Sequence, residues 1–175
     1  MRKSGTDRGI IKLPVYKGPP GEEEFISKLE GCTYNIEDGK IVSTKLTKDG
    51  IFHEQVMGKH HQEKISMPNL KEGSVFEYRY TKETPFSVRD TPETWYFQTS
   101  IPMQWCELNL HIPVNLNYLI LKRGYIPIHT NTSEASRMVM GSLETGGVNY
   151  HIAVKHAPAF KDEPFITSTE DCISK

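Results

Sequence analysis

The sequence is dominated by short segments in which apolar and polar residues alternate, and this pattern limits the fold more than any other feature. Residues 74–81 are the clearest case, because three aromatic residues there alternate with Val75, Glu77 and Arg79. Residues 106–112 and 148–155 repeat the alternation. Successive side chains of a β-strand point to opposite faces, so each segment predicts a strand with one buried and one wet face.

Turn residues separate the segments. Asp38-Gly39 lies between two extended stretches and predicts a hairpin, because a type I′ turn needs positive φ at both central residues. Ile10–Tyr16 reads as a first strand, and its Pro14 indicates an edge or a bulge. Two further connections, at 69–73 and 145–147, are expected to be hairpin turns. Three weaker strands are expected at 95–99, 117–122 and 136–141.

Helical signal is poor. The best helix candidate is Glu22–Leu29, which overlaps the start of the stretch 25–36 that leads into the Asp-Gly hairpin. Eight or nine strands with little helix predict an all-β fold, a two-layer antiparallel β-sandwich. The chain has 175 residues, 37% of them hydrophobic. One core of that size is expected, so residues 1–175 are predicted to form a single domain.

Charge and hydropathy exclude several partners. The 21 basic and 22 acidic residues give a net charge of -1, without the basic excess typical of nucleic-acid binding. No apolar run approaches the roughly 18 residues of a transmembrane helix. Met1 to Gly5 lack the apolar stretch of a signal peptide, so none is expected in this chain.

The three cysteines, Cys32, Cys106 and Cys172, lie far apart and form no CxxC pair. A structural zinc site needs closely spaced ligands, so none is expected. Buried free thiols are the default interpretation, and one disulfide with a cysteine left over stays open. No cysteine follows a helix start that would lower its pKa, so the chain is expected to be non-catalytic.

Three histidines, His53, His60 and His61, form the densest cluster of that residue. His60 and His61 are adjacent, so on a strand they would face opposite ways and could not share a metal ion. We expect a solvated, lysine-rich segment here, with no metal site and no cofactor.

Four aromatic residues are the candidate binding residues: Trp95, Tyr96, Phe97 and Trp105. Most of them would fill a sandwich core, as large aromatics usually do. Only alternate residues of 95–97 can face the same layer, so at least one ring is expected outside, where it could anchor a partner or stack on a sugar.

Several ordered blocks resemble an uncharacterised family of β-sandwich domains found N-terminal to transglutaminase-like domains in bacterial proteins. These blocks are PNLKEGSVFEYRY at 68–80, YNIEDGKIV at 34–42, WYFQ at 95–98 with Ile101-Pro102, and APAFKDEPF at 157–165. Together they cover about residues 25–170. The resemblance implies an Ig-like sandwich, which agrees with the strand count.

The resemblance also implies a function. Family members carry further strands before the one resembling Ile10–Tyr16, so residues 1–24 are interpreted as a truncated first-strand region, and 157–175 as a linker toward an absent downstream domain. The catalytic residues would lie in that domain. The chain is then a non-catalytic interaction module of a larger, exported bacterial protein, which positions or assists the transglutaminase-like domain.

Two further expectations complete the sequence-based picture. The alternative function is an independent glycan- or peptide-binding domain on the cell surface, which the fold alone does not exclude. An uncovered strand edge tends to pair with another chain, so a weak homodimer through the Ile10–Tyr16 edge is expected.

Overall fold

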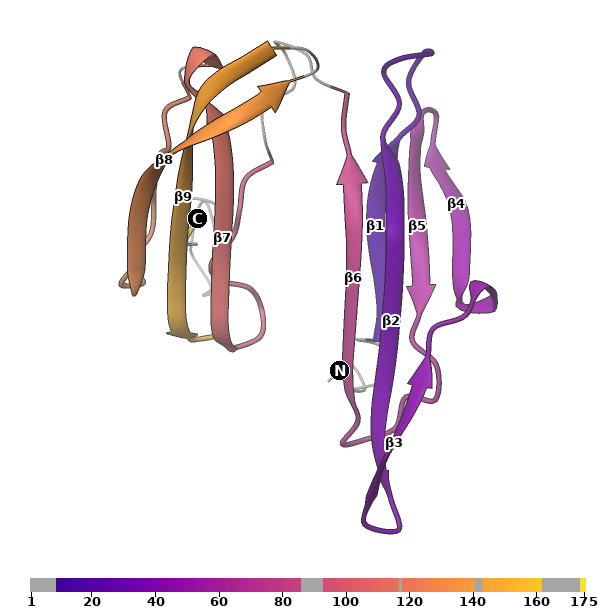
Figure 1. Cartoon of the computed structure of the whole chain (residues 1–175). Helices are drawn as coiled ribbons and strands as arrows, with labels where there is room; N and C mark the ends of the chain where they lie inside the picture. The colour runs from indigo at the N-terminus through magenta and orange to yellow at the C-terminus, as the bar shows by residue number, and fades with distance from the viewer. Residues whose placement is uncertain (1–8, 86–92, 117, 141–142, 162–173) are drawn as a thin grey trace. The chain divides into compact units, whose positions relative to one another are not determined.

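The computed structural model describes residues 9–85, 93–116, 118–140, 143–161 and 174–175. Within them the protein is all-β, with nine strands in three antiparallel sheets of three strands each (Figure 1). The described residues contain no α-helix, and η2 (Lys48–Gly50) and η3 (Val114–Leu116) are 3₁₀ turns. The predictions of an all-β chain and of eight or nine strands are therefore confirmed.

Contacts divide the chain into two compact units, unit 1 (Met1–Thr91) and unit 2 (Pro92–Lys175). Each unit has its own sheets and its own cluster of buried apolar side chains. The single-domain assignment of residues 1–175 stays a prediction, and each unit is described by itself.

The first sheet of unit 1 has the order β1 (Ile10–Tyr16), β5 (His60–Ser66) and β4 (Ile51–Met57). β5 is the central strand, and it pairs with β1 along the whole length of both strands. β1 has the bounds expected from the sequence and lies at the edge of the sheet, which is where its Pro14 is tolerated.

The second sheet of unit 1 has the order β3 (Lys40–Lys45), β2 (Phe25–Glu37) and β6 (Val75–Glu83). Asp38 and Gly39 join β2 to β3 with φ of 50° and 74°, as a type I′ turn requires. The helix expected at 22–29 is wrong, because β2 pairs with β6 from Phe25 onward. Pairing and burial of this segment override its weak helical preference.

Unit 1 buries residues from both of its sheets in one cluster. Leu13, Ile65 and Met67 are almost fully buried, and partly buried residues from β2 and β6 pack against them, including Ile26 and Phe76. The connection at 69–73 was expected to form a hairpin. That expectation is wrong, since it joins β5 to β6, which lie in different sheets.

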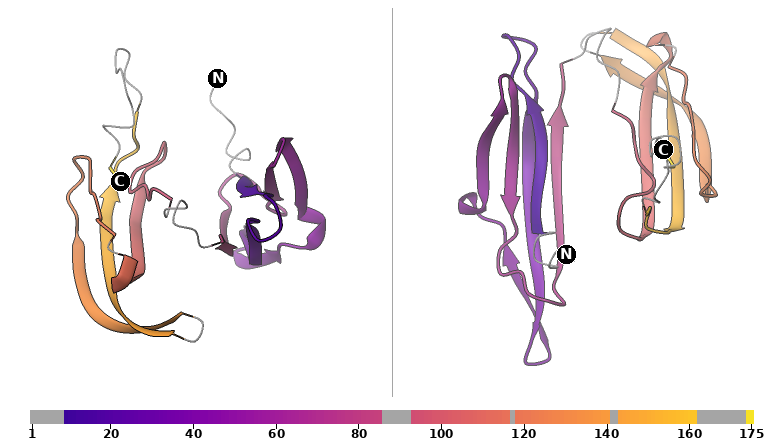
Figure 2. Two further views of the ribbon diagram at one scale, coloured as in Figure 1. Left: turned by 90° about the horizontal axis from the view of Figure 1, so that it is seen from above. Right: turned by 180° about the vertical axis from the view of Figure 1, so that it is seen from behind.

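Unit 2 has one described sheet, with the order β7 (Met103–Pro113), β9 (Leu143–Ala157) and β8 (Thr130–Met140). The strands expected at 106–112 and 148–155 are confirmed as parts of β7 and β9. Residues 145–147 lie inside β9, so the expected turn there is wrong. Figure 2 shows β8 and β9, drawn in orange, curving together along their length, in line with the twist of β-sheets.

The weaker strand predictions of unit 2 succeed only in part. Residues 95–99 and 118–122 have no strand structure, and residue 117 lies outside the described residues. The strand expected at 136–141 is the end of β8, which begins at Thr130, and Gly141 is again outside the described residues. The polar sequence of β8 hides its start, because strands with little alternation give no clear period.

One face of the unit 2 sheet carries the buried cluster. Phe97, Ile152, Val154 and Ala157 form it, and Ile120 and Ile126 from the segment before β8 pack against it. The residues of opposite parity on β7 and β9 point away from this cluster. They form what we call the polar face of unit 2.

Candidate functional site

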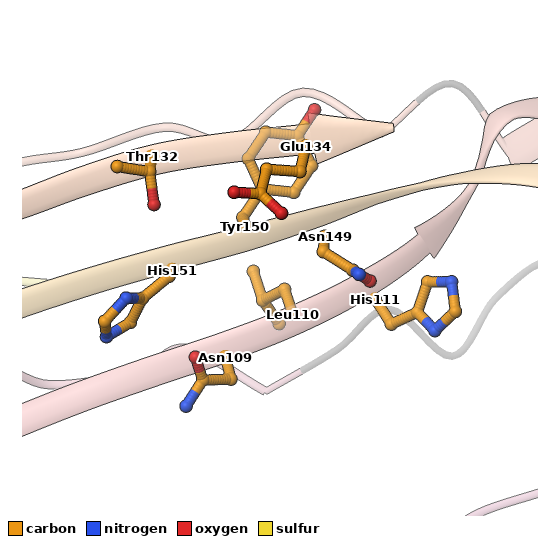
Figure 3. Close-up of a pocket in the computed structure, with 8 residues that line it drawn as sticks. All are labelled: Asn109, Leu110, His111, Thr132, Glu134, Asn149, Tyr150 and His151. Carbon is orange, nitrogen blue, oxygen red and sulfur yellow. The ribbon is translucent and has the colours of Figure 1, made fainter. Parts of the chain in front are cut away.

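The polar face of unit 2 holds two adjacent rows of polar side chains that run across all three strands. Asn109, His151 and Thr132 are register partners in the first row. His111, Asn149 and Glu134 are register partners in the second. Directly paired residues have Cβ atoms about 5 Å apart, so the six side chains are neighbours. They line a shallow pocket of about 420 Å³ (Figure 3).

Glu107 holds one end of the first row in place. Its carboxylate accepts hydrogen bonds from Trp105 Nε1 at 2.7 Å and from Asn109 Nδ2 at 3.2 Å. His151 Nε2 lies 3.6 Å from the same carboxylate. These contacts, the one with Trp105 above all, keep the pKa of Glu107 below its ordinary value. The site therefore contains an ionised carboxylate that orients both an amide and an imidazole.

His111 is held by a contact across the central strand. Its Nε2 lies 2.9 Å from Ser136 Oγ on β8, with β9 between the two residues. Gly147 of β9 makes this possible, because a Cβ at that position would lie 2.8 Å from His111 Nε2 and 3.0 Å from Ser136 Oγ. Glycine at position 147 of β9 therefore leaves the space in which His111 of the second row contacts Ser136.

The other end of the polar face is aromatic. The rings of Trp105 and His129 meet edge to face, with centroids 5.5 Å apart. Trp105 belongs to β7 and His129 directly precedes β8, so their contact passes over β9, where Ala153 is fully buried. The Trp105 side chain stays 45% exposed and can still meet a ligand.

Three polar side chains of the pocket have no hydrogen bond or ion pair within the described part of the chain: Thr132, Glu134 and Asn149. All three are exposed. They contrast with Glu107, Asn109 and His111, which are held by protein contacts. The pocket therefore combines fixed groups on β7 with unused donors and acceptors on β8 and β9.

The aromatic residues expected to bind lie in different environments. Trp95 and Tyr96 are 44% and 43% exposed, while Phe97 is 6% exposed and belongs to the buried cluster. Tyr96 lies under the Lys175 ammonium, 6.0 Å from the ring centroid. Of the four, Trp105 belongs to the polar face, where it donates to Glu107. A contact role for the four residues together stays a prediction.

The cysteines and histidines singled out in the sequence form no shared site among the described residues. Cys32 and Cys106 are free thiols on β2 and β7, and Cys172 lies outside the described residues. Burial raises the pKa of Cys106, whose Sγ donates to the Tyr96 carbonyl oxygen at 3.8 Å. His53 Nδ1 of β4 pairs with Glu63 of β5 at 2.6 Å. The described residues contain no group of three possible metal ligands.

The six polar residues that line the pocket were not singled out from the sequence. Asn109 and His111 alternate with apolar residues in 106–112, and Asn149 and His151 do so in 148–155. That pattern indicated a wet face and nothing more. One sequence signal pointed to these residues. Each of the two segments carries an Asn and a His two positions apart, and in an antiparallel pair such residues can lie side by side on one face. The first part of β8, with Thr132 and Glu134, had no strand signal in the sequence.

Comparisons with known proteins show a similarity of fold only. No family model matches the sequence, and no curated protein matches it. The structure is similar to the crystal structure of a putative protease from Parabacteroides distasonis, with a TM-score of 0.58 and 14% sequence identity. The match covers 97% of this chain and 32% of that chain, so this chain spans about a third of the matched protein. Among the described residues, no helix is long and apolar enough to cross a membrane.

Proposed function

We propose that this chain is a non-catalytic accessory module of a larger, exported bacterial protein, where it positions or assists a transglutaminase-like catalytic domain. The observation that carries the proposal is the coverage of the structural match, which takes in 97% of this chain but 32% of the other. A fold that occupies part of a longer chain is typical of a module working beside other domains.

The chemistry of the described residues supports a non-catalytic role. A cysteine nucleophile needs a base within hydrogen-bond reach and a lowered thiol pKa. The pKa of Cys106 is instead raised by burial, and its thiol donates to a backbone carbonyl. The histidines of the polar face contact Glu107 and Ser136 rather than a thiol.

The proposed fold is an Ig-like sandwich in which the two sheets of unit 1 are the layers. The shared cluster supports it, because Leu13 and Ile65 from one sheet pack with Ile26 and Phe76 from the other. Sheets of a sandwich meet in this way, through alternate residues of both inner faces.

The proposal is tested with the complete reading frame. The full-length protein is compared with a version that lacks residues 1–175 in an acyl-transfer and peptide-hydrolysis assay, and this chain is also assayed alone. We expect the chain alone to be inactive and the deletion to lower kcat/KM. Activity of this chain that is lost in Cys106→Ser contradicts the proposal. A reading frame without a catalytic domain also contradicts it.

A second experiment does not depend on whether the deletion variant folds. We also propose that the exposed ring of Tyr96 contacts the next domain. Tyr96→Ala in the full-length protein removes this ring, and Phe52→Ala is the matched control, since Phe52 is 47% exposed in unit 1. We expect only Tyr96→Ala to increase amide hydrogen exchange at a domain interface. Equal exchange in the two variants counts against docking through this ring.

A further inference from the structure

We infer that the polar face of unit 2 binds a neutral oligosaccharide, with Thr132, Glu134 and Asn149 contacting its hydroxyl groups and Trp105 stacking on one of its rings. This inference goes beyond the accessory role, and either can hold without the other.

The first step is the chemistry of the unused groups. The Asn149 amide can both donate and accept, the Thr132 hydroxyl can do the same, and the Glu134 carboxylate accepts. Neighbouring hydroxyls of a sugar present donors and acceptors side by side, so they match this mixture. The three side chains occupy neighbouring register positions on β8 and β9, within the pocket shown in Figure 3.

The second step is that the rest of the pocket is already fixed. Glu107 holds Asn109 and His151, and Ser136 holds His111. Side chains held in advance lose less conformational entropy when a ligand binds. The ligand therefore meets a partly ordered surface, with free groups on β8 and β9 and held groups on β7 and β9.

The charge of the face does not single out an anionic ligand. Glu107 and Glu134 place two carboxylates on it, and the exposed Lys155 of β9, the register partner of Trp105, is a basic group on the same face. The location also disfavours an extended peptide, which is bound mainly through backbone groups at a sheet edge. Asn149 and His151 lie on β9, the central strand, so recognition here depends on side chains.

The third step concerns ligand length. Trp105 and His111 are six positions apart on β7, a distance of about 20 Å along a strand. A single sugar ring cannot reach both. An oligosaccharide can place one ring over the half-exposed indole of Trp105 and another in the pocket, since aromatic faces pack against apolar ring surfaces.

The test is calorimetric titration of the complete 175-residue chain with cellohexaose, mannohexaose, maltohexaose and the hexamer of N-acetylglucosamine. Polygalacturonate, heparin and a mixture of unstructured peptides are the comparison ligands. We expect at least one neutral hexasaccharide to bind. The double variant Glu134→Gln/Asn149→Ala should weaken that binding roughly tenfold or more, because it removes two or three hydrogen-bonding groups.

Two controls make the result specific. Ser133→Ala changes the next residue of β8, which has the opposite parity, and should leave the affinity unchanged. Trp105→Ala should weaken binding of the hexasaccharide but not of the matching disaccharide. Tryptophan fluorescence and thermal unfolding of Glu134→Gln/Asn149→Ala establish that this variant remains folded.

Three results overturn the inference. The first is no binding of any neutral hexasaccharide. The second is binding that the double variant leaves intact, because the site then lies elsewhere. The third is binding of heparin, polygalacturonate or peptides in place of the neutral sugars.

Discussion

Truncation of Ile65 tests whether the two units are stabilised by separate cores. Ile65 is fully buried on the central strand β5 and belongs to the cluster of unit 1. Ile65→Ala removes about three carbons, each worth about 0.8 kcal/mol of transfer free energy. With the cavity that remains, we expect unit 1 to lose about 3 kcal/mol of its free energy of unfolding.

Ile36→Ala is the matched control, since it makes the same chemical change in the same unit at a side chain that is 80% exposed. Exposed positions without special contacts change stability by about 0.5 kcal/mol or less. The difference between the two variants isolates burial as the cause.

The assay is urea unfolding followed by two signals. Both tryptophans of the chain, Trp95 and Trp105, lie in unit 2, so tryptophan fluorescence reports on that unit alone. Far-UV circular dichroism reports on the strands of both units. At a slope of about 2 kcal/mol per molar urea, Ile65→Ala should lower the unit 1 midpoint by about 1.5 M.

The fluorescence midpoint should not move, because the described cores share no residue. A fluorescence midpoint that falls by the same amount refutes this reasoning. It would mean that the chain unfolds as the single domain expected from its length and composition.

Three further predictions follow from local features. Trp105→Phe removes the main hydrogen bond to the Glu107 carboxylate, so the pKa of this carboxyl group, measured by NMR, should rise toward the ordinary value of about 4.3. The stabilisation that this carboxylate contributes is present at neutral pH and is lost as the pH falls through its lowered pKa. An unchanged pKa in Trp105→Phe contradicts this role of the hydrogen bond. Gly39→Ala should destabilise unit 1 by about 1–2 kcal/mol in urea unfolding, because φ at Gly39 is 74°. An added Cβ meets no atom within 4 Å, so backbone strain is the expected cause and not a steric clash. An unaffected midpoint would mean that the turn rearranges freely. The edge strand β1 should give a weak dimer in light scattering at high protein concentration, and a strictly monomeric protein would refute this expectation.

The amino-acid sequence determined the strands with the clearest alternation and one turn, because these depend on local chemistry. The alternation in 106–112 and 148–155 was enough to place β7 and β9, and Asp38-Gly39 was enough to place the β2–β3 turn. In each case neighbouring residues carry the signal, through the two-residue period of a strand or through the positive φ of a type I′ turn.

Only the tertiary structure decided which strands pair and which faces are covered. The chain at 22–29 had its best local match to a helix, yet its later residues join β2 because β6 lies beside them. The polar strand β8 had almost no pattern of its own, and its place beside β9 is what brings Thr132 and Glu134 next to His151 and Asn149. Pairing depends on residues far apart in the chain and on the surface that they bury together, so no local pattern contains it.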